Sequence, residues 1–179
     1  MSRDPGKRRR RTVRIIGVIS DTHGLLRPEA VAALEGSELI LHAGDVGDLR
    51  ILDELRRIAP VHAVYGNTDW GEVRGRLPRI AEVDLGSEDG KVAGAPAGPL
   101  AYVHHGDREL DMDPAAAGIE MVVSGHTHRP LVHERDGVLY LNPGSAGPRR
   151  FTLPATVARV RVGEGGKLEA EIVTLNEGS

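Results

Sequence analysis

The sequence predicts one α/β domain with a mainly parallel sheet, and three observations lead to this class. The chain has 179 residues, of which 40% are hydrophobic, and this suits one domain with a full core. From residue 13 onward, short apolar runs alternate with stretches of helical spacing, as in βαβ units. Residues 156–162 and 168–174 instead alternate apolar with polar residues, which is typical of antiparallel strands with one solvated face. We therefore assign residues 13–179 to a single domain.

The first half of this domain predicts alternating strands and helices. Pro28 suits the first turn of a helix, where its missing amide hydrogen costs nothing, and Gly36 is a plausible end. Asp48 is the expected N-cap of a second helix, in which leucines recur at helical spacing before Pro60. The expected strands and helices lie at residues 13–19, 28–34, 39–43, 49–58 and 61–65.

The second half predicts more strands and fewer helices. Glycines and prolines interrupt the pattern between residues 71 and 99, which indicates a hairpin or surface loop around one strand. A short helix is expected to begin at Asp113 and Pro114. The expected strands lie at residues 80–85, 100–103, 121–123, 131–134, 138–141, 156–162 and 168–174.

Charge and composition limit the classes of partner. The net charge of −3 argues against bulk attraction to nucleic acid or to an anionic membrane. Residues 1–12 form a basic tail that we expect to be disordered, and the alternative for the run Arg8–Arg11 is a weak contact with a polyanion. No apolar segment is long enough for a signal peptide or a membrane span, so a cytoplasmic location without membrane contact is expected. The five aromatic residues are scattered, which disfavours a surface for single-stranded nucleic acid.

Potential metal ligands follow five of the expected strands at their carboxyl ends. Because ligands bind outside these ends in α/β sheets, we expect the five segments to converge. Residues i and i+2 of an extended chain point the same way, which aligns the two members of each D-x-H or H-x-H pair. The alternative, core histidines with turn-forming acids, requires five separate coincidences. The side chains concerned are Asp21, His23, Asp45, Asn67, His105, His126 and His128.

The donor types indicate which ions would bind. Oxygen and imidazole donors without any cysteine suit Mn²⁺, Fe²⁺, Ni²⁺ or Zn²⁺. Seven donors are too many for one ion, so two divalent ions are expected, with Mn²⁺ first and Mg²⁺ also possible. With two carboxylates and one hydroxide, such a centre keeps a formal charge of about +1, which favours an anionic phosphate ester.

These blocks resemble the calcineurin-like metallophosphoesterase superfamily, specifically its small bacterial and archaeal phosphodiesterase branch. The D-x-H-G, G-D, G-N, H-G and G-H-x-H blocks stand in the family's order, and residues 142–149 resemble its N-P-G-S-x-x-x-P-R segment. The resemblance implies a β-sandwich of two sheets flanked by helices. It also implies that Asp45 bridges two ions, one held by Asp21, His23 and His128 and the other held by Asn67, His105 and His126.

The implied activity is hydrolysis of a small phosphodiester by a hydroxide that bridges the two ions. Asn67 is a catalytic candidate, because it is expected to stabilise, together with the two ions, the charge that develops on the reacting phosphate. Larger members of the superfamily carry a histidine after this asparagine, whereas this chain has Thr68, so no acid for the leaving group is identified. The alternative is a non-catalytic protein-binding scaffold, since a retromer subunit resembles the same branch. The sequence predicts neither the oligomeric state nor the physiological substrate.

Four further residues have two readings each. Asp69 is either the acid for the leaving group or a carboxylate that supports a turn. Ser145 and Arg149 are candidates for substrate binding, against a plain turn and a solvated charge. His42 either orders a metal ligand or is a core histidine with satisfied hydrogen bonds.

Overall fold

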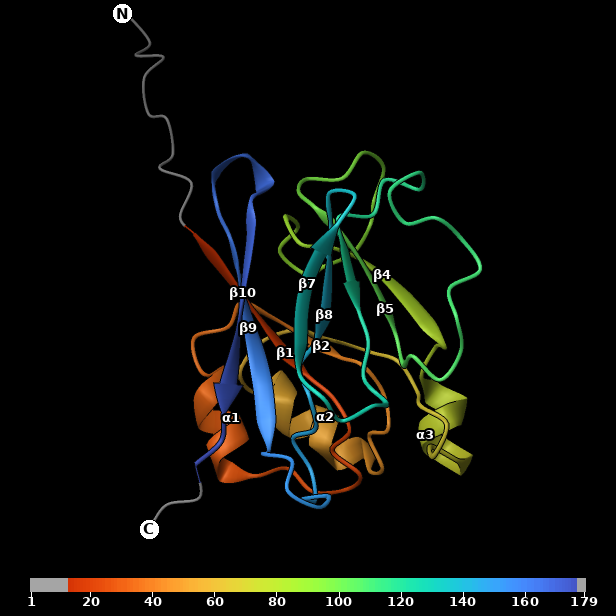
Figure 1. Cartoon of the computed structure of the whole chain (residues 1–179), viewed down its shortest axis with the longest axis vertical. Coiled ribbons are helices and arrows are strands. Elements are labelled where there is room, and N and C mark those ends of the chain that lie inside the picture. Colours follow the sequence, from red (N-terminus) through yellow and green to blue (C-terminus); the bar gives the residue numbers. More distant parts are fainter. Residues whose placement is uncertain (1–12, 177–179) are drawn as a thin grey trace, which may run out of the picture.

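Buried apolar runs form the centres of two five-stranded sheets in the computed structural model, which describes residues 13–176 (Figure 1). The first sheet has the order β10-β9-β1-β2-β3 and the second has the order β4-β5-β6-β8-β7. The first sheet contains β1 (Arg14–Ile19), β2 (Leu39–His42), β3 (Val61–Ala63), β9 (Thr156–Val162) and β10 (Leu168–Thr174). The second contains β4 (Ile80–Asp84), β5 (Leu100–His104), β6 (Met121–Val123), β7 (Leu131–Arg135) and β8 (Val138–Asn142).

Strand directions confirm the predicted mixture of parallel and antiparallel pairs. Strands β1, β2 and β3 run parallel, and so do β5, β6 and β8. The two C-terminal strands join the first sheet antiparallel, with Val160 of β9 opposite both Ile16 of β1 and Ala170 of β10. The predicted tail at residues 1–12 lies outside the described residues.

Two of the three helices begin where the sequence predicts. α1 (Pro28–Leu34) has Pro28 in its first turn, and the Asp48 carboxylate accepts the Arg50 N–H at 2.9 Å at the start of α2 (Leu49–Arg56). α2 ends two residues before the predicted position. α3 (Gly71–Arg76) was not predicted, because its six residues bury only Val73 and so carry no apolar period.

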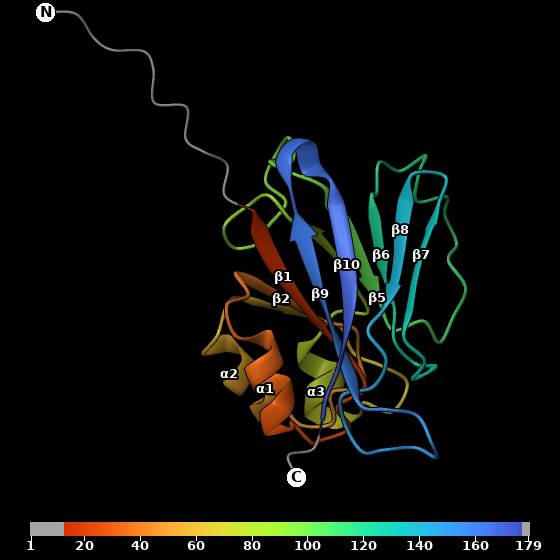
Figure 2. The same ribbon diagram turned by 60° about the vertical axis from the view of Figure 1, so that its left-hand side comes forward.

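The core has two main layers. Between the sheets, Ile16, Leu41, Val103, Met121 and Leu141 belong to one buried apolar cluster. The outer face of the first sheet points away from the second sheet. Its apolar residues pack against the helices, which cover this face in Figure 2. The helices therefore flank one sheet only.

The outer face of the second sheet is covered by an irregular segment, and the helix predicted at Asp113 is wrong. The Asp113 carboxylate does accept the Ala115 N–H at 3.0 Å, as a cap would. However, the chain makes a single turn and leaves it at Gly118, which has a φ of 75°. Leu110 and Met112 of this segment pack against Tyr102 and the rest of the small cluster on this face.

A buried carboxylate organises the loop between β4 and β5. These strands pair antiparallel across residues 85–99, which fits the predicted hairpin or surface loop. Asp84 accepts N–H groups from Gly86, Ala97 and Gly98 at 2.6 to 3.0 Å. The loop is therefore tied to the end of β4 through one side chain.

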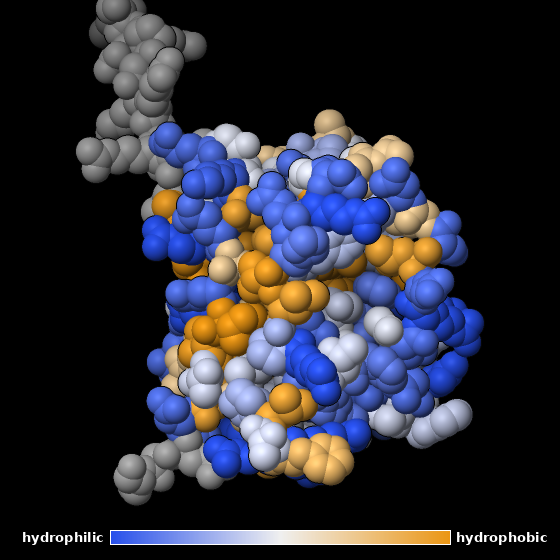
Figure 3. Space-filling model, viewed as in Figure 1, coloured by the Kyte–Doolittle hydropathy of each residue, from blue (hydrophilic) through white to orange (hydrophobic). Residues whose placement is uncertain are grey.

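The edge strands of the two sheets meet on both sides of the sandwich. β10 contacts β7 on one side, and β3 contacts β4 on the other. Figure 3 shows apolar side chains gathered in a band across the face where β10 and β7 lie. Leu131 and Val132 of β7 are exposed apolar residues. Within residues 13–176, no helix is long and apolar enough to cross a membrane.

Candidate metal centre

All seven predicted ligands come together at the carboxyl ends of the parallel strands. Turns after β1, β2 and β3 supply four of them, and turns after β5 and β6 supply the other three. These strands belong to two different sheets. The convergence therefore depends on the sandwich, in which the parallel strands of both sheets end on the same side.

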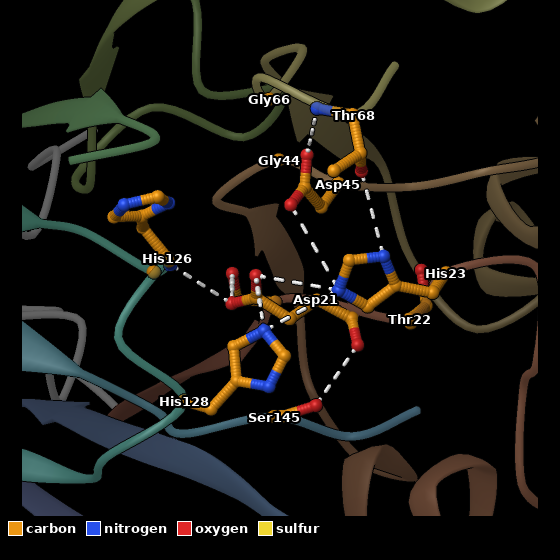
Figure 4. A network of polar contacts seen from close by, with 12 residues as sticks. Asp21, Thr22, His23, Gly44, Asp45, Gly66, Thr68, His126, His128 and Ser145 are labelled. Carbon is orange, nitrogen blue, oxygen red and sulfur yellow. Dashed lines mark hydrogen bonds and ion pairs between the residues drawn. The ribbon is translucent and has the colours of Figure 1, made fainter. Parts of the chain in front are cut away.

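The first ligand group consists of Asp21, His23 and His128. The Nε2 atoms of His23 and His128 lie 3.3 Å apart, and each faces Asp21 Oδ1, at 3.8 and 3.2 Å (Figure 4). Asp21 is buried, and no hydrogen bond reaches its Oδ1 atom from the described residues. A buried carboxylate oxygen without a partner is costly, and a cation between these three atoms would satisfy it.

The second ligand group consists of Asn67, His105 and His126. Asn67 Oδ1 lies 2.9 Å from His105 Nε2 and 3.1 Å from His126 Nδ1. His105 Nδ1 is 2.8 Å from the Ala43 carbonyl, so this nitrogen donates, and when the ring is neutral its Nε2 presents a lone pair. Lone pairs of Asn67 and His105 then face each other, which is the arrangement that a cation requires.

Asp45 stands between the two groups. Its Oδ2 atom lies 3.2 Å from His105 Nε2 and 3.8 Å from His23 Nε2, whereas Oδ1 accepts the Thr68 N–H at 2.8 Å. Burial alone would raise the pKa of Asp45, but its hydrogen bonds to His105 and Thr68 lower that pKa well below the ordinary value. Asp45 is therefore an anion that faces both groups, as expected of a bridging ligand.

The environment shifts the pKa values of two ligand histidines in opposite directions. Burial alone would lower the pKa of His105, but its hydrogen bonds with Asp45 and Ala43 raise it. Burial lowers the pKa of His23, despite the opposing effects of Asp45 and Asp21. The nearby positive charge of Arg150 adds to this decrease. A neutral imidazole is the form that binds metal ions.

Five of the seven ligands have left-handed backbone conformations, and this corrects the predicted reason for their alignment. Their φ angles lie between 45° and 69°, so the pairs do not converge through an extended chain. Tight turns aim each side chain separately, and His126 and His128 consequently reach different groups. Such strain in non-glycine residues is concentrated at functional sites. The five residues are Asp21, His23, Asp45, His126 and His128.

Two glycines let the ligand turns approach one another. A Cβ atom on Gly66 would overlap with the side chain and backbone of Asp45, and one on Gly125 would overlap with the Ser20 hydroxyl. Both positions therefore need glycine because neighbouring chain occupies the space of a side chain.

The contacts of Asp69 fit the supporting reading, and its role as an acid for the leaving group stays a prediction. Its buried carboxylate accepts the N–H groups of Val46 and Gly66 on Oδ2 and that of Gly47 on Oδ1, at 2.8 to 3.0 Å. Both oxygens thus accept backbone N–H groups next to the two ligands, because Val46 and Gly47 follow Asp45 and Gly66 precedes Asn67. Asp69 therefore supports the turns that carry these ligands.

The predicted substrate residues Ser145 and Arg149 lie in a segment beside His128. Ser145 is buried, and its hydroxyl donates to the Asp21 carbonyl at 3.0 Å, so its side chain supports a ligand turn. This contact fits the turn reading, and a role of Ser145 in substrate binding stays a prediction. Arg149 is exposed, and its role in substrate binding stays a prediction.

The sequence offered no signal for a second supporting residue, Ser20. Its hydroxyl donates to Asp21 Oδ2 at 2.6 Å, and the His126 N–H donates to the same oxygen at 3.1 Å. Oδ2 is therefore satisfied by the protein, which leaves Oδ1 to face the first ligand group. Serine next to a candidate ligand is too common to be informative by itself.

His42 is a fully buried histidine whose two nitrogens are both paired. Its Nδ1 accepts the Gly44 N–H at 3.2 Å, so Nε2 carries the hydrogen and donates to Thr22 Oγ1 at 3.0 Å. Thr22 in turn donates to the Val46 carbonyl at 2.9 Å. His42 thus links the turns after β1 and β2 without touching a ligand group.

Burial lowers the pKa of His42 from 6.5 to about 4, and this predicts acid-sensitive stability. Because the pKa in the folded state is the lower one, the stabilisation is complete above pH 6.5 and disappears as the pH falls towards 4. His42→Gln should remove up to about 3 kcal/mol of this pH dependence, which urea unfolding at several pH values measures. His133→Gln, at an exposed position, is the control and should leave the pH dependence unchanged. Equal pH dependence in wild type and His42→Gln would contradict the assignment.

Carboxylate, amide and imidazole side chains meet at one end of a two-sheet sandwich, and this donor set suits divalent metal ions. The family model of the calcineurin-like phosphoesterase superfamily domain matches residues 15–165, and the chain belongs to this superfamily.

Individual relatives agree with this assignment. The chain is 40% identical over 168 residues to a probable metallophosphoesterase of Methanothermobacter thermautotrophicus, covering 89% of this chain and 91% of the relative. It is 32% identical over 140 residues to a phosphodiesterase of Methanocaldococcus jannaschii, covering 72% and 82%. The solved structure of vacuolar protein sorting 29 from Cryptosporidium parvum has the same fold, with a TM-score of 0.66, 19% identity and coverage of 92% and 99%.

Proposed function

We propose that this protein is a phosphodiesterase that binds two divalent metal ions, with Mn²⁺ the first candidate. The observation that carries the proposal is the meeting of seven donor side chains, with three on each side of Asp45. The name of the 32% identical relative supports a diester as the substrate. The completeness of the ligand set favours the enzyme over a protein-binding scaffold.

The bound ions would lower the pKa of a water molecule towards neutrality and offset the charge of the phosphate. The protein's own residues position these participants. Asn67 turns its Oδ1 towards His105 and His126, so its amide Nδ2 is the end that donates to a phosphate oxygen. Asp69, Ser20 and Ser145 hold the turns of Asp45 and Asp21 and thereby fix the donor geometry.

The first test is metal dependence. A chelator should abolish hydrolysis of bis(p-nitrophenyl) phosphate, and Mn²⁺ should restore it, with about two ions per chain by elemental analysis. Ni²⁺, Fe²⁺, Zn²⁺ and Mg²⁺ are compared in the same assay. Undiminished turnover in the metal-free protein would exclude this mechanism, and a pure protein that binds no metal would support the scaffold.

The second test concerns Thr68, which stands where larger family members have a histidine. Its hydroxyl lies 3.5 Å from His23 Nδ1, and its own side chain offers no imidazole to protonate a leaving group. We therefore expect diesters with acidic leaving groups to react better than phosphate monoesters. Thr68→His should help alkyl leaving groups more than aryl ones, by up to about a hundredfold. The measurement is the slope of log kcat/KM against leaving-group pKa, and equal slopes for the two proteins would refute the idea.

A further inference from the structure

Trp70 is a large aromatic side chain that the fold leaves in solvent. It is the single tryptophan of the chain, and 72% of its surface is exposed. It precedes α3 and makes no side-chain hydrogen bond that caps this helix. Burial in the core therefore does not explain a tryptophan at this position.

Arg74 holds the Trp70 ring in place. The Arg74 guanidinium carbon lies 5.5 Å from the centre of the Trp70 ring and 4.6 Å from the centre of the Tyr65 ring. Cation–π contacts of this kind restrict the rotamers of both partners. The indole is thus preordered on one side while most of its surface faces solvent.

The ring pair flanks a ligand turn of the metal centre. Tyr65 directly precedes and Trp70 directly follows the turn Gly66–Asp69, which carries Asn67 and is fixed to the Asp45 turn by the Asp69 carboxylate. Trp70 is the third residue after Asn67, so their Cα atoms are at most about 11 Å apart. The backbone that carries the indole therefore lies close to a ligand of the metal centre.

A groove of about 540 Å³ connects Trp70 with the turn after β2. Gly47 and Asp48 line it opposite α3, and Gly47 packs so closely on His23 and Gly24 that a Cβ atom there would overlap with their backbone. Its charged side chains form two ion pairs within the groove, Asp48 with Arg50 and Glu72 with Arg76, and the remaining one, Asp53, pairs with Arg56 outside it. Their mutual neutralisation leaves no excess positive charge for a second phosphate, which disfavours a polynucleotide.

We propose that Trp70, backed by Arg74, is a stacking platform for a planar aromatic substituent of the phosphodiester substrate. The inference rests on the proposed phosphodiesterase function and adds a substrate class to it, namely diesters that carry an aryl ring or a nucleobase. Aromatic stacking tolerates either kind of ring, because both have a π face.

A binding experiment uses the fluorescence of Trp70, which is the whole tryptophan signal of the protein. Diphenyl phosphate should quench this fluorescence with saturation, whereas dimethyl phosphate should leave it unchanged at the same concentration. The measurement requires no turnover, so it tests the platform even if the hydrolase proposal fails. Equal responses to both diesters, or no response to either, would overturn the inference.

A kinetic experiment compares the same two compounds as competitive inhibitors of bis(p-nitrophenyl) phosphate hydrolysis. In Trp70→Ala, the inhibition constant of diphenyl phosphate should rise at least about fivefold, the low end for stacking on an aromatic side chain. The constant for dimethyl phosphate should stay within about twofold, since its phosphate binds at the metal centre.

Three controls separate stacking from a general disturbance. Trp70→Phe should restore the diphenyl phosphate constant to within about threefold of wild type. Arg74→Ala should weaken binding of diphenyl phosphate, because the indole loses its support. Arg57→Ala removes the same charge from an exposed arginine that does not line the groove and pairs with Glu54, and it should have no effect. If both inhibition constants rise together in Trp70→Ala, Trp70 shapes the metal centre and the stacking proposal is wrong. If the wild-type protein hydrolyses no diester at all, the proposed phosphodiesterase function fails instead.

Discussion

Asp45→Asn is expected to lower kcat for a phosphodiester by about a hundred- to a thousandfold, the scale for loss of a preorganised electrostatic group. Asparagine keeps an oxygen that can accept the Thr68 N–H, so the turn should survive. It removes the negative charge that faces both His23 and His105. Because one side chain serves both groups, both ions should bind more weakly.

The measurement combines kcat with metal content per chain. His126→Ala, which removes a ligand from the second group alone, should cost less activity and leave one ion per chain bound. Asp21→Asn tests the bridge, because Asp21 Oδ1 faces the first group. A larger loss in Asp21→Asn than in Asp45→Asn would show that Asp21 bridges instead.

Asp69→Ala should destabilise the protein by about 3 to 5 kcal/mol. The substitution leaves the N–H groups of Val46, Gly47 and Gly66 without a buried acceptor, and each such group carries a desolvation cost. Urea unfolding of the metal-free protein measures the effect. Metal affinity should fall as well, because these turns carry Asp45 and Asn67.

Asp84→Ala is the matched control, since Asp84 is also buried and also accepts three backbone N–H groups. It should lose comparable stability but keep its metal affinity, because its loop carries no ligand. Asp69→Asn distinguishes an acid for the leaving group from a carboxylate that positions the turns. Loss of an acid would make the rate depend more steeply on leaving-group pKa and leave the stability of the protein unchanged. Positioning predicts the opposite, with lower stability and an unchanged slope.

Local rules predicted those features that depend on local contacts. Pro28 and Asp48 mark helix starts through their own covalent and hydrogen-bonding properties, and the structure confirms both. The bounds of β9 and β10 were predicted to the residue, since alternation reports directly on which face is buried. The segment after Asp113 carries a correct start signal without enough helix-forming residues before Gly118, so that prediction failed.

The ligands themselves were predictable, but their support was not. Candidate ligands can be recognised in the sequence because few side chain types bind metal ions. Their place directly after a strand also predicts where in the fold they lie. The contacts of Ser145 with Asp21 and of Asp69 with Val46 join turns from distant parts of the chain. No periodicity or spacing encodes such pairs, which arise only when the two sheets pack together.

The left-handed ligand residues have a consequence for the evolution and engineering of this fold. Each costs about 1 kcal/mol relative to a glycine with the same backbone. A descendant no longer selected for catalysis would gain stability by accepting glycine at these places, starting with His23 or His126. A redesign that optimises stability alone would substitute the same five residues first. A stabilised variant that is meant to stay active must therefore keep these five residues unchanged.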